Sequence, residues 1–119
     1  MEYQFTNDKP IYLQLVDRFK AQIISGEYAE GSRLESVRDL ALKVKVNPNT
    51  MQKALSELER MGLVRTERTS GRFITDDSEM INTMRKELAE NEISAFLEKM
   101  KSLGFDKKEV IKIIQGEEL

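Results

Sequence analysis

The sequence predicts a mainly α-helical protein with one small β-hairpin, and three patterns support this fold class. Two short stretches in the first half of the chain carry apolar residues at three- and four-residue spacing, which is typical of amphipathic helices. Two short apolar and β-branched runs around a Ser-Gly turn follow them and predict a hairpin. A long helical pattern and a short, capped one complete the 119 residues. This order indicates a winged helix-turn-helix followed by a C-terminal helical hairpin.

The predicted helix pair lies within residues 34–62, and the turn between its helices carries the clearest local signals. Asn47 can cap the second helix, because its side chain accepts hydrogen bonds from free backbone N–H groups, and Pro48 suits the first helical turn. Gly62 can take the left-handed conformation that ends this helix. The apolar stripes are Val37, Leu40, Ala41 and Val44 in the first helix, and Met51, Ala54, Leu55, Leu58 and Met61 in the second.

The outer face of the second helix is polar near its N-terminus, which is the end that a recognition helix presents to base edges. Its residues are Asn49, Gln52, Lys53, Ser56 and Glu57. Such a face is also compatible with simple solvation, since many helical proteins contain two amphipathic helices joined by a tight turn. The pattern alone therefore leaves DNA binding and a solvated surface as alternatives.

The predicted hairpin favours DNA binding. Its strands are expected at residues 63–67 and 72–75, around a turn at 68–71. Arg68 and Arg72 stand beside small residues at the tip, an arrangement that suits a loop laid along a phosphate backbone or into a minor groove. We interpret the hairpin as a wing.

Residues 10–75 resemble the winged-helix domain of the GntR family of bacterial transcription regulators. The resemblance rests on the segments PIYLQLVDRFKAQIISGEYAEGSRL, SVRDLA, VNPNTMQKALSELERMGLV and SGRFI, which occur in the family order. The short chain, NPNT and LGFDKKEVIKII make it similar to the small YtrA-like branch. Two positions depart from the family pattern: Glu35 stands where proline is common, and Lys45 stands where glycine is common in the turn.

The resemblance implies which residues contact DNA. Arg38 matches an arginine that the family directs to DNA, with a solvated charge as the alternative. Lys53 is expected to bind a phosphate or to be solvated. Asn49 and Gln52 carry the paired donor and acceptor that suit adenine, whereas Thr50 offers a hydroxyl or a methyl group. The predicted DNA-binding residues are Ser36, Arg38, Asn47, Asn49, Thr50, Gln52, Lys53, Arg68, Ser70, Gly71 and Arg72.

Three of these predicted DNA-binding residues have a structural role that would explain them equally well. Ser36 can cap the first helix of the pair or bind a phosphate. Asn47 is first a cap, with phosphate contact as an addition. Gly71 suits any tight hairpin.

The first helix is expected at residues 10–25, with an apolar row of Ile11, Leu15, Phe19 and Ile23 that packs under the helix pair. Gly26 ends it, and a loop follows at residues 27–32. Arg33 and Leu34 can add a short strand to the wing, as the family resemblance implies.

Residues 76–119 read as a second region made of two helices. Asp76, Asp77 and Ser78 can cap a long helix that Gly104 ends, and Asp106 with Glu109 forms a capping box for a last helix. Phe105 and Val110 are placed as a hydrophobic staple. About 40 residues seldom fold alone, so the apolar faces need a neighbour.

We predict residues 1–75 to be the DNA-binding domain and residues 76–119 to be a helical dimerisation region. As an alternative, the apolar faces of residues 76–119 pack against the winged helix of the same chain. A further alternative is that they form a small pocket for a hydrophobic ligand. The predicted dimerisation residues are Ile81, Met84, Leu88, Ile93, Phe96, Leu97, Met100, Ile111 and Ile114.

Composition limits the possible functions. The net charge is −2 with a pI near 5.3, but residues 1–75 hold 12 Lys and Arg against 10 Asp and Glu, whereas residues 76–119 hold 7 against 11. The acidity therefore lies mainly in the C-terminal region. The chain has no cysteine and no histidine, which removes disulfides, thiolate nucleophiles and the usual zinc ligands. No membrane-spanning run or signal peptide is evident, so a cytoplasmic protein is expected.

The sequence therefore predicts a homodimeric transcriptional regulator, a repressor, that binds double-stranded DNA at a palindromic operator. The YtrA-like resemblance suggests a transporter operon as target. No phosphate loop, metal spacing or nucleophile group is present, so we expect no enzyme, cofactor or metal. A protein-interaction module without specific DNA binding is the alternative, and a small-molecule effector is left open.

Overall fold

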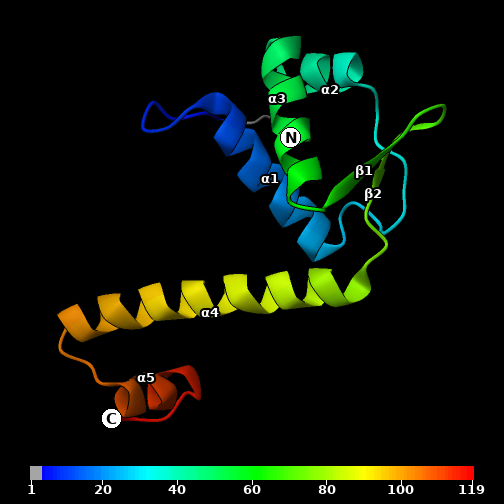
Figure 1. The fold of residues 1–119 in the computed structure, drawn as a ribbon. Helices are drawn as coiled ribbons and strands as arrows, with labels where there is room; N and C mark the ends of the chain where they lie inside the picture. The colour runs from blue at the N-terminus through cyan, green and yellow to red at the C-terminus, as the bar shows by residue number, and fades with distance from the viewer. Residues whose placement is uncertain (1–3) are drawn as a thin grey trace. The chain divides into compact units, whose positions relative to one another are not determined.

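The computed structural model describes residues 4–119, which form five helices and one antiparallel hairpin (Figure 1). This architecture confirms the predicted fold class. The chain packs into two units, one ending at Asn82 and the other running from Thr83 to Leu119. The elements are α1 (Ile11–Ser25), α2 (Val37–Val44), α3 (Pro48–Arg60), β1 (Val64–Glu67), β2 (Gly71–Ile74), α4 (Ser78–Ser102) and α5 (Lys107–Ile114).

The core of the N-terminal unit lies between α1 and α3, which make the most extensive helix contact of the chain. Both helices bury one apolar stripe, and each large apolar side chain removed from water contributes about 1.5–3 kcal/mol. Ile11 is a correction to the predicted row: it is 43% exposed, because α1 begins at Ile11 with Pro10 as its N-cap residue, and this first turn extends past the core. The buried stripes are Leu15, Val16, Phe19, Ile23 and Ile24 of α1 and Met51, Ala54, Leu55 and Leu58 of α3.

The turn between α2 and α3 has the predicted caps. The Ser36 hydroxyl accepts a hydrogen bond from the Asp39 N–H at 3.1 Å, and the Asn47 side chain accepts one from the Asn49 N–H at 2.7 Å. Pro48 is the first residue of α3. Lys45 is left-handed at φ 59° and ψ 50°, as expected where the family has glycine. Local chemistry therefore determines where α2 ends and where α3 begins.

The wing pairs β1 with β2 in antiparallel register from Val64 opposite Ile74 to Glu67 opposite Gly71. β1 begins one residue later than predicted. β2 begins one residue earlier, because Gly71 pairs with Glu67 in the ladder instead of belonging to the turn. The predicted short strand at Arg33 and Leu34 is a single bridge from Arg33 to Phe73. It is supported by hydrogen bonds from the Leu34 N–H to the Arg72 oxygen at 2.9 Å and from the Ile74 N–H to the Ser32 oxygen at 2.8 Å.

The C-terminal unit contains most of α4, and α5. The Asp77 carboxylate accepts a hydrogen bond from the Met80 N–H at 3.0 Å, so it caps the start of α4. The capping box of α5 is present, with Asp106 Oδ1 accepting from the Glu109 N–H at 2.8 Å and Glu109 Oε1 accepting from the Asp106 N–H at 3.1 Å. Val110 is buried, whereas the other apolar residues of α5 are exposed. No helix within residues 4–119 is both long and apolar enough to span a membrane.

Candidate DNA-binding surface

The outer face of α3 presents the residues that the sequence predicted for base recognition. Asn49, Gln52 and Lys53 are exposed, Thr50 is half-buried, and Met51 between them points into the core. The Gln52 amide donates a 3.3 Å hydrogen bond to the Ser56 hydroxyl, a weak contact that leaves its oxygen free to accept. Asn and Gln amides at the exposed N-terminal part of a helix can pair with the edges of bases in a major groove.

Lys53 is held by a residue of another helix. Its ammonium lies over the ring of Tyr12 in α1, 4.1 Å from the ring centroid. Such a cation–π contact contributes about 0.5–1 kcal/mol at an exposed site. The contact joins residues 41 positions apart, so local sequence patterns do not predict this partner of Lys53. Tyr12 is not part of the apolar row of Ile11, Leu15, Phe19 and Ile23, so helical spacing does not indicate which element it faces.

The acidic residue on the outer face of α3 is paired. Glu57 is half-buried, and its carboxylate oxygens accept hydrogen bonds from the Arg60 Nε at 3.1 and 3.0 Å. This hydrogen bonding lowers the pKa of Glu57 and raises the pKa of Arg60. The pair lies in the C-terminal half of α3, so it leaves the N-terminal half to the amides and Lys53.

The N-terminus of α2 supplies a second group of predicted residues. Arg38 is exposed, and its side chain has no hydrogen bond or ion pair with any residue in the described part of the chain. The hydroxyl of Ser36 is occupied by its capping bond. Glu35, which departs from the family pattern, forms an ion pair with Lys43 at 3.3 Å. This exposed pair adds little stability, but it places a cation beside the extra acidic group.

The arginines of the wing differ in whether their side chains have a partner. Arg65 forms an ion pair with Glu67 and lies over the Phe73 ring at 5.0 Å from its centroid. Arg68 is exposed at the tip and, within residues 4–119, has no carboxylate partner. Arg72 is half-buried, and its Nε is buried without a hydrogen-bond partner. Ser70 and Gly71 complete the tip, with Gly71 at φ 99°.

The residues predicted for dimerisation differ in exposure. Ile93, Phe96, Ile111 and Ile114 are exposed, while Met84, Leu88, Leu97 and Met100 are half-buried. Ile81 is a correction, because its side chain is only 1% exposed and belongs to the N-terminal unit, so it is not accessible to a partner. That unit extends through Asn82, and the first turn of α4 is part of it.

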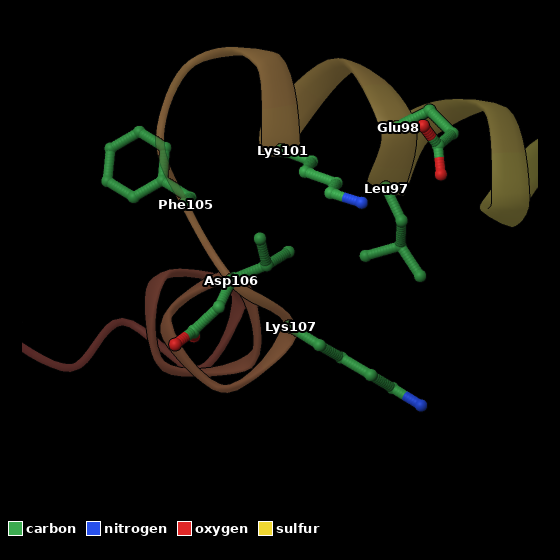
Figure 2. Close-up of a pocket in the computed structure, with 7 residues that line it drawn as sticks. Leu97, Glu98, Lys101, Phe105, Asp106 and Lys107 are labelled. Carbon is green, nitrogen blue, oxygen red and sulfur yellow. The ribbon is translucent and has the colours of Figure 1, made fainter.

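A small open cavity of about 250 Å³ lies between the end of α4 and the start of α5. Leu97 points from α4 toward α5 (Figure 2), and Phe105 and Val110, the residues of the predicted staple, also line the cavity. Its volume is below the range of about 300–1,000 Å³ that is typical of ligand pockets. In residues 4–119, no cluster of acidic side chains is placed to hold a metal ion.

Comparisons with known proteins identify the family of this chain. The model for bacterial regulatory proteins of the gntR family matches residues 11–74. The chain is 39% identical to the HTH-type transcriptional regulator YhcF of Bacillus subtilis over 115 residues, which cover 97% of this chain and 95% of YhcF. It is 35% identical to the HTH-type transcriptional repressor YtrA of the same organism, over 82% of this chain and 70% of YtrA.

A solved GntR family transcriptional regulator from Listeria monocytogenes has the same fold, with a TM-score of 0.83 and 36% identity over 96% of this chain and 100% of that one. These relatives are transcriptional regulators and not enzymes, in agreement with the sequence analysis. Their similarity covers the helix pair, the wing and the C-terminal helices together. This chain is therefore a transcriptional regulator of the GntR family, with that family's DNA-binding fold.

Proposed function

We propose that this protein represses transcription by binding a palindromic operator as a homodimer, with α3 in the major groove and the wing along the backbone. The observation that carries the proposal is the N-terminal half of α3, where Asn49, Gln52 and Lys53 are exposed on a helix whose other face is buried. Similarity to the repressor YtrA supports repression instead of activation.

In this proposal the predicted residues have three roles. Asn49 and Gln52 bind base edges, with adenine as the favoured partner, and Thr50 offers its hydroxyl or methyl group beside them. Phosphates are bound by Arg38 and Lys53, and by the wing tip at residues 68–72. Ser36 and Asn47 hold the helix ends that place these side chains.

A homodimer is proposed because the C-terminal unit leaves several large apolar side chains exposed and because two half-sites increase affinity without new contacts. The exposed side chains are Ile93, Phe96, Leu103, Ile111, Ile113 and Ile114. A two-fold protein matches a palindromic operator. We further propose a transporter operon as the target, following the YtrA-like resemblance, and a cytoplasmic site of action.

Selection of duplexes from a random pool by the purified protein, at near-physiological salt, tests the proposal. Arg38→Ala is the test variant and Arg60→Ala is its control, since Arg60 is an exposed arginine at the opposite end of the helix pair. We expect an inverted repeat with half-site centres about 10 base pairs apart, recovered by the parent and the control but not by Arg38→Ala. Recovery of no common sequence would reject specific binding and favour the protein-interaction alternative.

A further inference from the structure

We propose that Arg33 is an additional DNA-binding residue of the wing, with its guanidinium resting over Gly71 and binding a backbone phosphate. This inference rests on the proposed function and adds a residue to its surface. Arg33 belongs to the loop between α1 and α2, far from the wing in sequence. Its bridge to Phe73 and the two flanking backbone hydrogen bonds fix it beside β2.

The side chain of Arg33 lies over the glycine of the wing. A β-carbon placed on Gly71 would be 3.4 Å from the Arg33 Nε, 3.5 Å from its Nη2 and 3.8 Å from its Cζ. These three nearly equal distances mean that the flat guanidinium rests on the Gly71 position. Glycine suits this position because its φ of 99° disfavours other residues, whereas a β-carbon would only touch the guanidinium at ordinary van der Waals distance.

The charge near Arg33 is not neutralised by the wing's own carboxylate. Glu67 stands opposite Gly71 in the β1–β2 register, but it is bound by Arg65. In the described residues Arg33 has no ion pair or hydrogen bond through its side chain, and the same holds for Arg68. The hairpin therefore carries exposed guanidinium groups without counter-ions.

A phosphate is the ligand that fits this arrangement. Guanidinium groups bind phosphate through parallel N–H donors, and backbone contacts from a wing position the neighbouring helix on the duplex. Because Arg33 is anchored by backbone bonds to β2, it moves with the wing. Arg33 thus links the loop before α2 to the same stretch of DNA that the wing binds.

The salt dependence of DNA binding tests this assignment. Arg33→Gln, Arg33→Lys and the control Arg60→Gln are compared with the parent, using the duplex recovered by selection and an unrelated duplex. Each phosphate contact contributes about 0.9 to the slope of log Kobs against log salt. We expect Arg33→Gln to reduce this slope by about 0.9 per bound protomer and to weaken binding to both duplexes by a similar factor.

The control Arg60→Gln should leave the slope unchanged, and Arg33→Lys should retain most of it, since a lysine still supplies a point charge to phosphate. Thermal unfolding of Arg33→Gln should match that of the parent, because the side chain is exposed. If the parent binds duplexes and Arg33→Gln has the parental slope, Arg33 is not a phosphate ligand although the proposed function stands. If the parent binds neither duplex, the proposed function itself fails.

Discussion

Lys45 holds a backbone conformation that L-residues with a side chain rarely adopt, at φ 59° and ψ 50°. The left-handed region costs about 1–2 kcal/mol for a residue with a β-carbon, and glycine avoids most of that cost but loses more entropy on folding. We therefore predict that Lys45→Gly raises the free energy of unfolding by about 0.5 kcal/mol, measured by urea denaturation.

The matched variant for this prediction is Lys45→Ala, which removes the same side chain but keeps the backbone strain. Its stability should stay near that of the parent or fall below it. A Lys45→Gly protein no more stable than Lys45→Ala would show that the turn is not strained.

Tyr12 is expected to act on DNA binding through Lys53, since the Lys53 ammonium lies over its ring. We predict that Tyr12→Leu weakens operator binding about two- to five-fold, the equivalent of a cation–π contact, because the ammonium is no longer held in place. Tyr12→Phe keeps the ring and should bind like the parent.

A double-mutant cycle separates this positioning role from a general effect on packing. In a Lys53→Gln background, Tyr12→Leu should have no further effect on the dissociation constant. An equal loss in both backgrounds would show that Tyr12 acts through the fold, and a loss in Tyr12→Phe would assign the role to its hydroxyl.

Among the secondary-structure elements, α3 begins at a residue with two expected roles. Asn47 caps the helix and is expected to lie near a DNA phosphate. Its side chain caps the helix through the Asn49 N–H at 2.7 Å. We predict that Asn47→Ala lowers the free energy of unfolding by about 1 kcal/mol, while Asn47→Asp, which also caps well, keeps the parental stability.

The Asn47 variants should rank differently in DNA affinity than in stability. Asn47→Asp adds a negative charge beside the expected phosphate path, so it should bind the selected duplex less tightly than Asn47→Ala, measured by fluorescence anisotropy. Parental affinity in Asn47→Asp would mean that no phosphate comes near this helix end.

The ends of the helices were predicted correctly wherever a capping residue or a turn residue marked them. Ser36, Asn47 with Pro48, and Asp106 with Glu109 were predicted as caps and form the predicted bonds. The wing was less predictable in detail, because strand ends depend on which residues pair across the ladder. Gly71 joins β2 and the expected strand at Arg33 is reduced to one bridge.

At the scale of the whole molecule, the exposed apolar residues of the C-terminal unit lead to a prediction about assembly. Ile93 is 56% exposed on α4, and the neighbouring Ser94 is exposed but polar. We predict that Ile93→Glu weakens dimerisation at least ten-fold, measured by sedimentation, because it places a charge in an apolar interface. Operator binding should weaken with it, since the two half-sites are no longer linked.

Ser94→Glu is the matched control, with the same added charge one position along the same helix. Its dimerisation should be close to that of the parent. Equal effects of the two variants would assign the change to net charge, and a parent that sediments as a monomer would reject the dimer.

The fold class, the order of the elements, the caps and the family were all predictable from the sequence. They depend on residues close together in the chain or on a run of matched positions. Helical period, the Asn47–Pro48 start and the Gly62 stop are such local features, and they also predicted the exposed polar face of α3.

The contacts between residues distant in sequence were not predictable and became apparent in the folded protein. The tertiary structure places Tyr12 under Lys53 and Arg33 over Gly71, and it buries Ile81 in the N-terminal unit although its spacing matched the stripe of a dimerisation helix. The physical reason is that these contacts depend on how separate segments pack. The spacing of apolar residues predicts that a side chain is buried. Which residues it contacts depends on how helix, loop and hairpin pack together.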